Sequence, residues 1–323
     1  MRDEVGASTY AVTEEQASLA AAMTASLPAL APGAALHGRV CLVTGASRGL
    51  GKETALGLAQ LGATVLLLTR DQRLGDAAAE DVARRSGNTN VAVVVADLAS
   101  FADVRSAAAQ IRERYDALHV LVHNAGVNSA RRKLSADGIE LTLAVNHLAP
   151  FLLTHELLPS LRRGADQGGA RIVTVASMFE RFGRVDFEDP QGERGWVGLF
   201  AYTQSKLANL LFTYELAARL ASSGITANCV DPGLVATDLM REHVLFRPRW
   251  LKAVWGRVLS TPERGARAAV YAASAPELAT VTGRCFDQRG RIITTSRRSR
   301  TPAMRERLWA LSERLTGVRF DTA

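Results

Sequence analysis

The chain contains little of several residue types, and each shortage excludes a class of protein. Only three of the 323 residues are cysteines, and Cys41, Cys229 and Cys285 lie far apart without a CxxC pair. This number and spacing exclude a disulfide-stapled scaffold and a cysteine-based metal site. They indicate small buried thiols in a reducing compartment. We therefore expect a cytoplasmic protein that binds no metal.

Long hydrophobic runs are also missing. A helix needs roughly 20 apolar residues to cross a bilayer, whereas the longest runs, such as 64–69 and 91–96, have only the length of a strand. The Ala-rich stretch 17–31 is not a secretory signal, because four acidic residues precede it against one arginine. Residues 1–37 are interpreted as an N-terminal extension, either a short helix after a capping box at 13–16 or a disordered arm.

Lysine is scarce as well. Four of the 39 basic residues are lysines and the rest are arginines, and the formal net charge is +7. The abundance of Arg and Ala is typical of GC-rich coding, and neither interleaved aromatic residues nor a nucleic-acid motif accompanies the charge. We therefore expect a small-molecule substrate and no nucleic acid.

What the sequence does contain is a regular alternation of strand and helix from residue 38 onward. Short β-branched runs without polar alternation are typical of parallel strands that are buried on both faces. Repeated βα units predict a doubly wound parallel sheet, an α/β Rossmann fold over 38–290 in a single domain, followed by a C-terminal extension over 291–323. The strands are expected at 39–45, 64–70, 91–98, 118–126, 170–177, 225–233 and near 281–287, and the helices at 49–62, 72–86, 101–115, 135–163, 200–222 and 261–275.

Three glycines in VTGASRGLG, at 43–51, lie where the first strand turns into the first helix. Gly45 suits a tight turn, Gly49 lets the backbone approach a phosphate, and Gly51 lets the helix pack close to the strand. The helix then presents free N–H groups and the positive end of its dipole to a pyrophosphate. The pattern predicts a dinucleotide site, with a tight turn that binds nothing as the alternative.

Tyr202 and Lys206 lie four residues apart in YTQSK, so they share one face of the helix expected at 200–222. A nearby ammonium lowers the pKa of a tyrosine, which then exchanges a proton with an alcohol or carbonyl oxygen more easily. A lysine in a chain that prefers arginine fits a role for a compact ammonium. The alternative is an exposed helix face without chemistry.

These motifs together resemble the short-chain dehydrogenase/reductase family. The glycine spacing matches the family's cofactor loop and YTQSK its YxxxK. Three further stretches agree with it: ADL at 96–98 with its adenine-contacting Asp-Leu, HNAG at 123–126 with its NNAG, and DPGLVAT at 231–237 with its PGxVxT. The resemblance covers about 38–290, and 145–154 with 261–286 look most like the retinol-dehydrogenase-like branch.

The resemblance implies roles for individual residues. Ser177 is expected to hydrogen-bond the substrate oxygen and Asn146 to bind a water in a proton relay from Lys206. Asn124 is expected to steady the central strand and the cofactor, and Thr237 to contact the nicotinamide carboxamide. The full set of expected cofactor-binding residues is Gly45, Ser47, Arg48, Gly49, Leu50, Gly51, Arg70, Asp97, Leu98, Asn124, Ala125, Gly126, Tyr202, Lys206, Pro232, Gly233 and Thr237.

The end of the second strand bears on the choice between NADP and NAD. Enzymes that use NAD place an acidic residue there to hold the ribose 2′-OH, but here Thr69 is followed by Arg70. Arg48 and Arg70 can hold a 2′-phosphate through bidentate hydrogen bonds. We predict NADP(H), while Asp71 keeps NAD as the less favoured alternative.

Two segments are expected near the substrate. Residues 178–200 lengthen the interval between Ser177 and Tyr202, and they either loop out near the substrate or form a surface excursion. The stretch 238–260 mixes tryptophans with basic residues. It is interpreted as a lid over a lipophilic ketone or aldehyde, as a surface for a membrane or an acidic carrier protein, or as a subunit contact.

The sequence thus predicts an NADP-dependent oxidoreductase that interconverts a carbonyl and an alcohol on a lipophilic small molecule. Reduction of another bond, such as an activated C=C, or of a carrier-tethered substrate is one alternative, and a non-catalytic NADP-binding interaction protein is another. The resemblance also implies a homo-oligomer built through the fourth and fifth helices. Residues 291–300 are expected to form a solvated loop.

Overall fold

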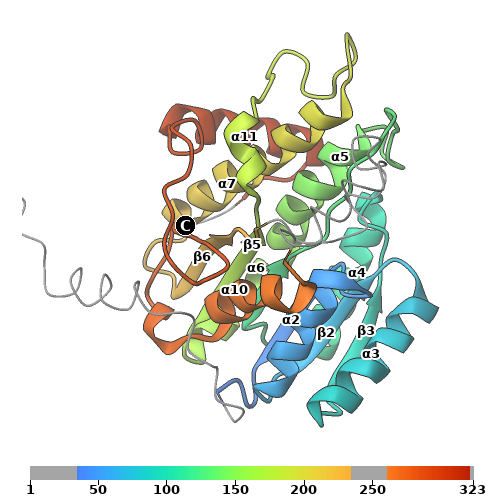
Figure 1. The fold of residues 1–323 in the computed structure, drawn as a ribbon, viewed down its shortest axis with the longest axis vertical. Coiled ribbons are helices and arrows are strands. Elements are labelled where there is room, and N and C mark those ends of the chain that lie inside the picture. The colour runs from blue at the N-terminus through green and yellow to red at the C-terminus, as the bar shows by residue number, and fades with distance from the viewer. Residues whose placement is uncertain (1–34, 234–259, 321–323) are drawn as a thin grey trace, which may run out of the picture.

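The structure is a computed structural model that describes residues 35–233 and 260–320. Within these ranges, seven strands form one sheet in the order β3-β2-β1-β4-β5-β6-β7, and all neighbouring strands pair in parallel (Figure 1). The predicted doubly wound Rossmann fold is therefore confirmed. The strands are β1 (Val40–Thr44), β2 (Thr64–Thr69), β3 (Val91–Val95), β4 (Val120–His123), β5 (Ala170–Val175), β6 (Ile225–Val230) and β7 (Cys285–Phe286).

Helices cover both faces of the sheet, and successive strand residues point into two separate apolar clusters. In β1, Leu42 packs with the side of α4, α6 and α7, whereas Cys41 and Val43 pack with the side of α2, α3 and α10. Burial on both faces explains why the strands lack polar alternation. The long helices are α2 (Gly49–Gln60), α3 (Gln72–Ser86), α4 (Phe101–Arg114), α6 (Ala149–Asp166), α7 (Gly198–Arg219), α10 (Pro262–Ser274) and α11 (Pro302–Thr316).

The fourth predicted helix differs from the expectation. Instead of one helix over 135–163, the chain forms a loop closed by a bridge between Leu134 and Glu140, then the short α5 (Leu141–Leu143) and the π-helix η1 (Ala144–Leu148) before α6. The side chain of Glu140 accepts a hydrogen bond from the N–H of Leu143, which fixes the later start. A π-turn inserted in an α-helix often marks a functional position.

The chain after β7 also differs from the expectation, because residues 291–300 are not simply a solvated loop. Thr295 and Ser299 are buried and hydrogen-bond each other at 2.9 Å. The next helix, α11, lies along α7 (Figure 1). Its Trp309 is buried and contacts Phe151 of α6 and Phe212 of α7. The chain itself therefore covers part of the two helices that were expected to form subunit contacts.

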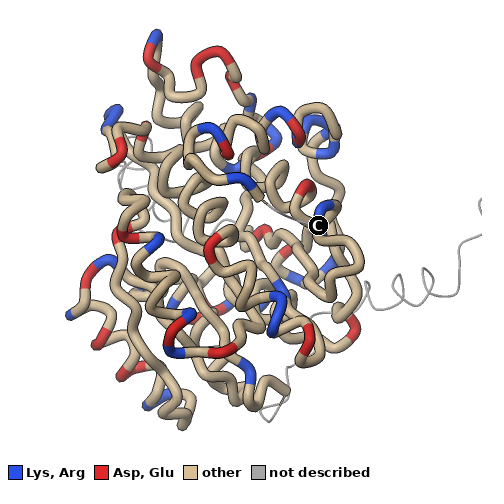
Figure 2. Tube along the Cα trace, turned by 180° about the vertical axis from the view of Figure 1, so that it is seen from behind, with Lys and Arg blue, Asp and Glu red and all other residues tan. Residues whose placement is uncertain are grey.

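Charges of both signs are mixed over the surface, as the rear view in Figure 2 shows for the described residues. Ion pairs such as Lys52–Asp81 and Arg85–Glu53 join neighbouring helices. In the described part of the chain, no helix is both long enough and apolar enough to cross a membrane. The N-terminal extension up to residue 34 and nearly all of the expected lid at 238–260 lie outside the described residues.

Candidate active site

Each of the three positions in the first loop is occupied by glycine for a different structural reason. Gly45 has φ +65°, and a Cβ there would lie 2.9 Å from the Cα of Ala125. A Cβ on Gly51 would lie 2.4 Å from the carbonyl oxygen of Gly45, so the helix packs too closely for a side chain. Gly49 has φ +56° but open space around its Cβ position. The backbone at Gly49 is therefore bare and accessible, which fits the approach of a phosphate.

The N-terminus of α2 continues this surface. Its N-cap, Arg48, makes no side-chain capping hydrogen bond, and the first turn contains no acidic residue. Within the described residues, no N-cap side chain therefore occupies the first N–H groups of α2. Ser47 is partly buried and Leu50 is buried. These donors and the helix dipole fit the pyrophosphate of a dinucleotide.

Thr44, which the sequence motifs do not predict as a site residue, joins the glycine loop to the end of β4. Its hydroxyl accepts hydrogen bonds from the N–H groups of Asn124 and Ala125, each at 3.0 Å. The side chain of Asn124 donates to the carbonyls of Thr44 and Gly45 at 2.8 and 3.3 Å. Asn124 thus braces the central strands. The sequence feature that could have identified Thr44 as a site residue is its position directly before Gly45.

At the end of β2, Arg70 and Asp71, the two residues that could contact the cofactor ribose, have different surroundings. Arg70 is exposed at the strand end. Asp71 is the N-cap of α3, and its carboxylate accepts a hydrogen bond from the N–H of Leu74 at 2.8 Å. On the next loop, Asp97 accepts from the N–H of Ala99 at 2.9 Å, and Leu98 is buried. The carboxylate of Asp71, the reason for keeping NAD as an alternative cofactor, therefore caps α3.

The residues expected to be catalytic come together where β5 meets α7. The ammonium of Lys206 lies 5.7 Å from the centre of the Tyr202 ring and donates to the carbonyl of Val175 at 3.1 Å. Ser177 follows β5, and its side chain hydrogen-bonds the Tyr202 phenol. It also caps the 3-10 helix η2 (Met178–Phe182) by accepting from the N–H of Phe179. The 25-residue separation in sequence becomes direct contact because η2 and the following loop leave the site and return to it.

The protonation behaviour of the pair differs from the expectation. Burial raises the pKa of Tyr202 to about 12, partly offset by the hydrogen bond from Ser177. Burial also lowers the pKa of Lys206 to about 8. The expected lowering of the Tyr202 pKa by Lys206 is not found, because the removal of water from the phenol outweighs the effect of an ammonium that contacts Val175 rather than the hydroxyl. At neutral pH the phenol therefore keeps its proton.

Asn146 lies in the π-helix η1 and is fully buried. Its side chain accepts from the N–H of Val127 at 2.7 Å and donates to the carbonyl of Val127 and to the hydroxyl of Ser205, each at 2.9 Å. A Cβ on Gly126 would lie 3.5 Å from the Asn146 carbonyl oxygen and 3.8 Å from the Lys206 nitrogen. Asn146 therefore lies beside Lys206 and holds the loop after β4 against α7.

The loop after β6 completes the crevice. Pro232 is buried, and Gly233 has φ +72°. The carboxylate of Asp231 accepts from the N–H of Gly233 at 2.9 Å. Asp231 belongs to the DPGLVAT motif, which by itself does not predict that the Asp231 side chain lines the site. Thr237 lies outside the described residues.

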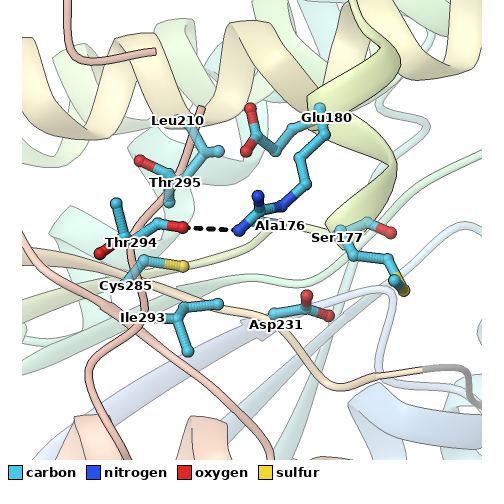
Figure 3. Close-up of a pocket in the computed structure, with 11 residues that line it drawn as sticks. Ala176, Ser177, Glu180, Leu210, Asp231, Cys285, Ile293, Thr294 and Thr295 are labelled. Atoms are coloured by element: carbon cyan, nitrogen blue, oxygen red, sulfur yellow. Dashed lines mark hydrogen bonds between the residues drawn. The ribbon is translucent and has the colours of Figure 1, made fainter. Parts of the chain in front are cut away.

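A cavity of about 300 Å³ opens beside Ser177 and Asp231. Figure 3 shows these two residues on one side of it, facing Thr294 and Thr295, with Leu210 reaching in from α7. Arg181 crosses to the carbonyl of Thr294 at 2.7 Å. Five of the exposed large apolar side chains lie in the segment between Ser177 and Tyr202, namely Met178, Phe182, Val197, Leu199 and Phe200.

The fold agrees with what comparisons with known proteins show. The chain belongs to the short-chain dehydrogenase/reductase family, because residues 39–246 match the family described as short chain dehydrogenase. Retinol dehydrogenase 11 of Homo sapiens is 40% identical over 286 residues, which cover 88% of each chain. This likeness places the chain in the retinol-dehydrogenase-like branch.

Solved structures agree with this assignment. A structure of an uncharacterised protein from Mycobacterium paratuberculosis has a TM-score of 0.71 and 35% identity, and the match covers 88% of this chain and 95% of that one. The Pseudomonas aeruginosa RhlG/NADP active-site complex has a TM-score of 0.65 and 29% identity, over 81% of this chain and 98% of that one. The chain is therefore an oxidoreductase that uses a nicotinamide cofactor on the alcohol or carbonyl group of a small molecule.

Proposed function

We propose that the protein reduces the carbonyl group of a lipophilic aldehyde or ketone with NADPH, and catalyses the reverse reaction where the cofactor is oxidised. The observation that carries this proposal is the contact of Ser177, Tyr202 and Lys206 in one cluster beside the glycine cradle. The bound nicotinamide would supply the hydride. The chain would supply the proton and the hydrogen bonds that orient the substrate.

The high pKa of Tyr202, about 12, supports the reductive direction. A phenol that stays protonated at neutral pH can donate its proton to the carbonyl oxygen as hydride reaches the carbon. The hydroxyl of Ser177 would donate a hydrogen bond to the same oxygen. Lys206 would hold the nicotinamide ribose and return a proton to Tyr202, with Asn146 beside it completing the relay, and Thr237 would contact the carboxamide.

Three observations support NADP(H). Arg70 and Arg48 are both exposed at the edge of the cradle, where guanidinium groups can pair with a 2′-phosphate. The carboxylate of Asp71 caps α3 instead of pointing an unengaged acceptor at a ribose hydroxyl. The Pseudomonas aeruginosa structure is, by its title, a complex with NADP. Asp97 and Leu98 would contact the adenine.

The apolar side chains around the site support a lipophilic substrate. Phe182 and Phe200 are 71% and 67% exposed, and both lie in the segment that joins Ser177 to Tyr202. Exposed apolar side chains next to a reactive centre favour an apolar ligand over a sugar or an organic acid. A relative with retinol dehydrogenase in its name fits the same class of substrate.

We also propose a reducing, cytoplasmic setting, supported by the three cysteines, which are buried and unpaired. A homo-oligomer remains a proposal. Because α11 covers part of α6 and α7, self-association would use another surface of the protein.

The test is the oxidation of NADPH by the purified protein, followed by absorbance, with a panel of lipophilic aldehydes, ketones and enones. We expect turnover of carbonyl compounds, with the alcohol identified as product by mass spectrometry. Turnover confined to the C=C bond of enones would contradict the proposal in favour of another reductase. Tight binding of NADPH without turnover of any compound would favour a tethered substrate or a non-catalytic binding protein.

A further inference from the structure

The cavity beside Ser177 has one wall that comes from the C-terminal part of the chain. Ile293, Thr294 and Thr295 line it, and Figure 3 shows Thr294 and Thr295 opposite Ser177. Residues 293–296 are called the C-terminal wall here. A segment that the sequence predicts as a solvated loop therefore lies next to the residue that is expected to hydrogen-bond the substrate oxygen.

Hydrogen bonds hold the C-terminal wall against β7 and α7. The N–H of Ile293 donates to the carbonyl of Cys285 at 2.8 Å, so the wall begins paired with the last strand of the sheet. The hydroxyl oxygens of Thr295 and Tyr214 lie 3.0 Å apart, and Tyr214 belongs to the helix that carries Tyr202. The wall therefore has a defined position relative to the reactive centre.

A third attachment joins the wall to η2, the short helix that Ser177 caps. Glu180 of η2 is only 3% exposed, and its carboxylate accepts from the N–H and the hydroxyl of Ser296 at 2.8 and 2.6 Å. Burial of a carboxylate is costly unless hydrogen bonds replace its lost water, so this pair resists separation. The N–H of Glu180 in turn donates to the carbonyl of Ser177 at 3.0 Å. The position of the wall is therefore coupled to that of Ser177.

The lining of the cavity indicates the kind of group that fits it. Ala176, Leu210 and Cys285 are buried and form its inner side. Arg181 donates to the carbonyl of Thr294 at 2.7 Å, and both residues are exposed, so this bridge lies on the solvent side. The two acids in the lining accept hydrogen bonds from the chain itself and disfavour an anion. An uncharged apolar group therefore fits the cavity best.

We propose that the C-terminal wall determines which substrates the protein accepts, an inference that rests on the proposed function and names its substrate class. The carbonyl oxygen lies at Ser177, and an apolar substituent of the carbonyl carbon fills the cavity between Leu210 and Ile293. The Arg181–Thr294 bridge limits its length.

The size of the cavity sets that limit. Its volume of about 300 Å³ holds about ten groups of ~30 Å³, the share of one water molecule in the liquid, and a methylene group is of similar size. The favoured substrates are therefore unbranched aldehydes with chains of about six to ten carbons.

The dependence of kcat/KM on chain length tests the proposal, with NADPH and the unbranched aldehydes from butanal to tetradecanal. In the wild type, kcat/KM should rise about fourfold with each methylene group that the cavity buries. It should fall at least about tenfold once the chain exceeds the cavity. Arg181→Ala removes the bridge and should move the optimum to longer chains.

Substitutions of Ile293 should move the optimum in opposite directions. Ile293→Phe fills part of the cavity and should lower the ratio of kcat/KM for decanal to that for butanal about tenfold. Ile293→Ala, the milder change for the fold, enlarges the cavity and should favour longer chains. The matched control Arg184→Ala removes another exposed arginine near η2 and should keep the wild-type profile.

Binding of an alcohol gives a second test, which does not depend on turnover. The chain has five methionines, of which Met178 lines the cavity, whereas Met304 lies in α11 outside its lining. Octanol cannot accept a hydride from NADPH, so it binds without reacting. In protein with carbon-13 in its methionine methyl groups and saturated with NADPH, octanol should shift the NMR signal of Met178, which Met178→Leu identifies, but not that of Met304. Ile293→Phe should raise the octanol concentration needed about tenfold.

The two tests separate the proposed function from the role of the wall. A wild-type protein that reduces no aldehyde, while octanol still shifts the Met178 signal and does so more weakly in Ile293→Phe, would refute the proposed function and support the cavity as the site of an apolar chain. Equal chain-length profiles in the wild type, Arg181→Ala and both Ile293 variants, or no shift of the Met178 signal by octanol, would overturn the proposal.

Discussion

The Nε2 atom of His147 lies 2.7 Å from the hydroxyl of Ser312, and both side chains are buried. His147 directly follows Asn146 in the π-helix, and Ser312 lies in α11. The C-terminal helix is thus joined to the turn that positions Asn146 beside Lys206. A segment that has no part in the chemistry stabilises the geometry on which the chemistry depends.

Trp309 is the side chain on which the attachment of α11 depends most. Its ring lies 5.0 Å from Phe151 and 4.8 Å from Phe320, and the guanidinium of Arg219 lies 4.3 Å from it. Trp309→Ala should lower the free energy of unfolding by about 3–5 kcal/mol, the usual cost of removing a large buried aromatic ring. Urea denaturation measures this, with exposed Arg300→Ala as the control. A loss below ~1 kcal/mol would show that α11 does not belong to the cooperative core.

The buried histidines make stability depend on pH. Burial lowers the pKa of both His123 and His147 to about 3, from an ordinary value of 6.5. Between these values, the unfolded chain binds protons that the folded chain does not, so stability is complete above pH ~6.5 and is lost as pH falls. At pH ~5, each histidine accounts for roughly 2 kcal/mol of this loss.

Substitution of one histidine isolates the effect. His123→Asn places a non-titrating residue at this position, so the difference in unfolding free energy between pH ~7 and ~5 should shrink by roughly 2 kcal/mol. The comparison of the two pH values removes any constant effect of altered packing. His37→Asn, at an exposed position, should leave the difference unchanged. An equal pH dependence in wild type and His123→Asn would contradict the account.

The glycine loop allows stability to be separated from cofactor binding. A methyl group on Gly51 would meet the carbonyl oxygen of Gly45, so Gly51→Ala should unfold or strongly destabilise the protein. A methyl group on Gly49 meets open space, so Gly49→Ala should cost only about 1–2 kcal/mol for its left-handed backbone. It should still weaken NADPH binding at least about tenfold, because the methyl group would occupy the place that we propose for a phosphate. Thermal melting and fluorescence titration with NADPH measure the two effects.

The proposed preference for NADP(H) assigns the recognition of the 2′-phosphate to Arg70 and Arg48. Arg70→Ala should raise the KM for NADPH by about ten- to a hundredfold, as expected for the loss of a charge-assisted bidentate contact, and change the KM for NADH little. Arg48→Ala should act in the same direction. The control Arg73→Ala removes another exposed arginine one turn away on α3. Equal losses with both cofactors would show that these arginines do not recognise the 2′-phosphate.

Much of this architecture could be predicted from the sequence because its causes are local. The runs of β-branched residues predict strands that are buried on both faces. The glycines at 45, 49 and 51 predict a turn between a strand and a helix. The YxxxK spacing places Tyr202 and Lys206 on the same face of a helix. Each signal lies within a few residues, so it does not depend on the rest of the fold.

The features that escaped prediction depend on contacts between distant segments. The π-turn contains Asn146, whose side chain hydrogen-bonds Val127 and Ser205, residues of two other segments. The pKa of Tyr202 depends on burial, which no spacing reports. The helix α11 did carry local signals, namely Thr301 before a proline, spaced leucines and Gly317 at its end, but nothing in them showed which surface it covers.

The central claim is that Tyr202 donates the proton to a carbonyl oxygen, and the comparison of Tyr202→Phe with Tyr115→Phe tests it most directly. The two variants lose the same hydroxyl group, one at the site and one at the end of α4. We predict that Tyr202→Phe lowers kcat for NADPH-dependent carbonyl reduction by about 10²–10⁴-fold while it binds NADPH normally, and that Tyr115→Phe matches the wild type. Carbonyl reduction by Tyr202→Phe at the wild-type rate would contradict the mechanism.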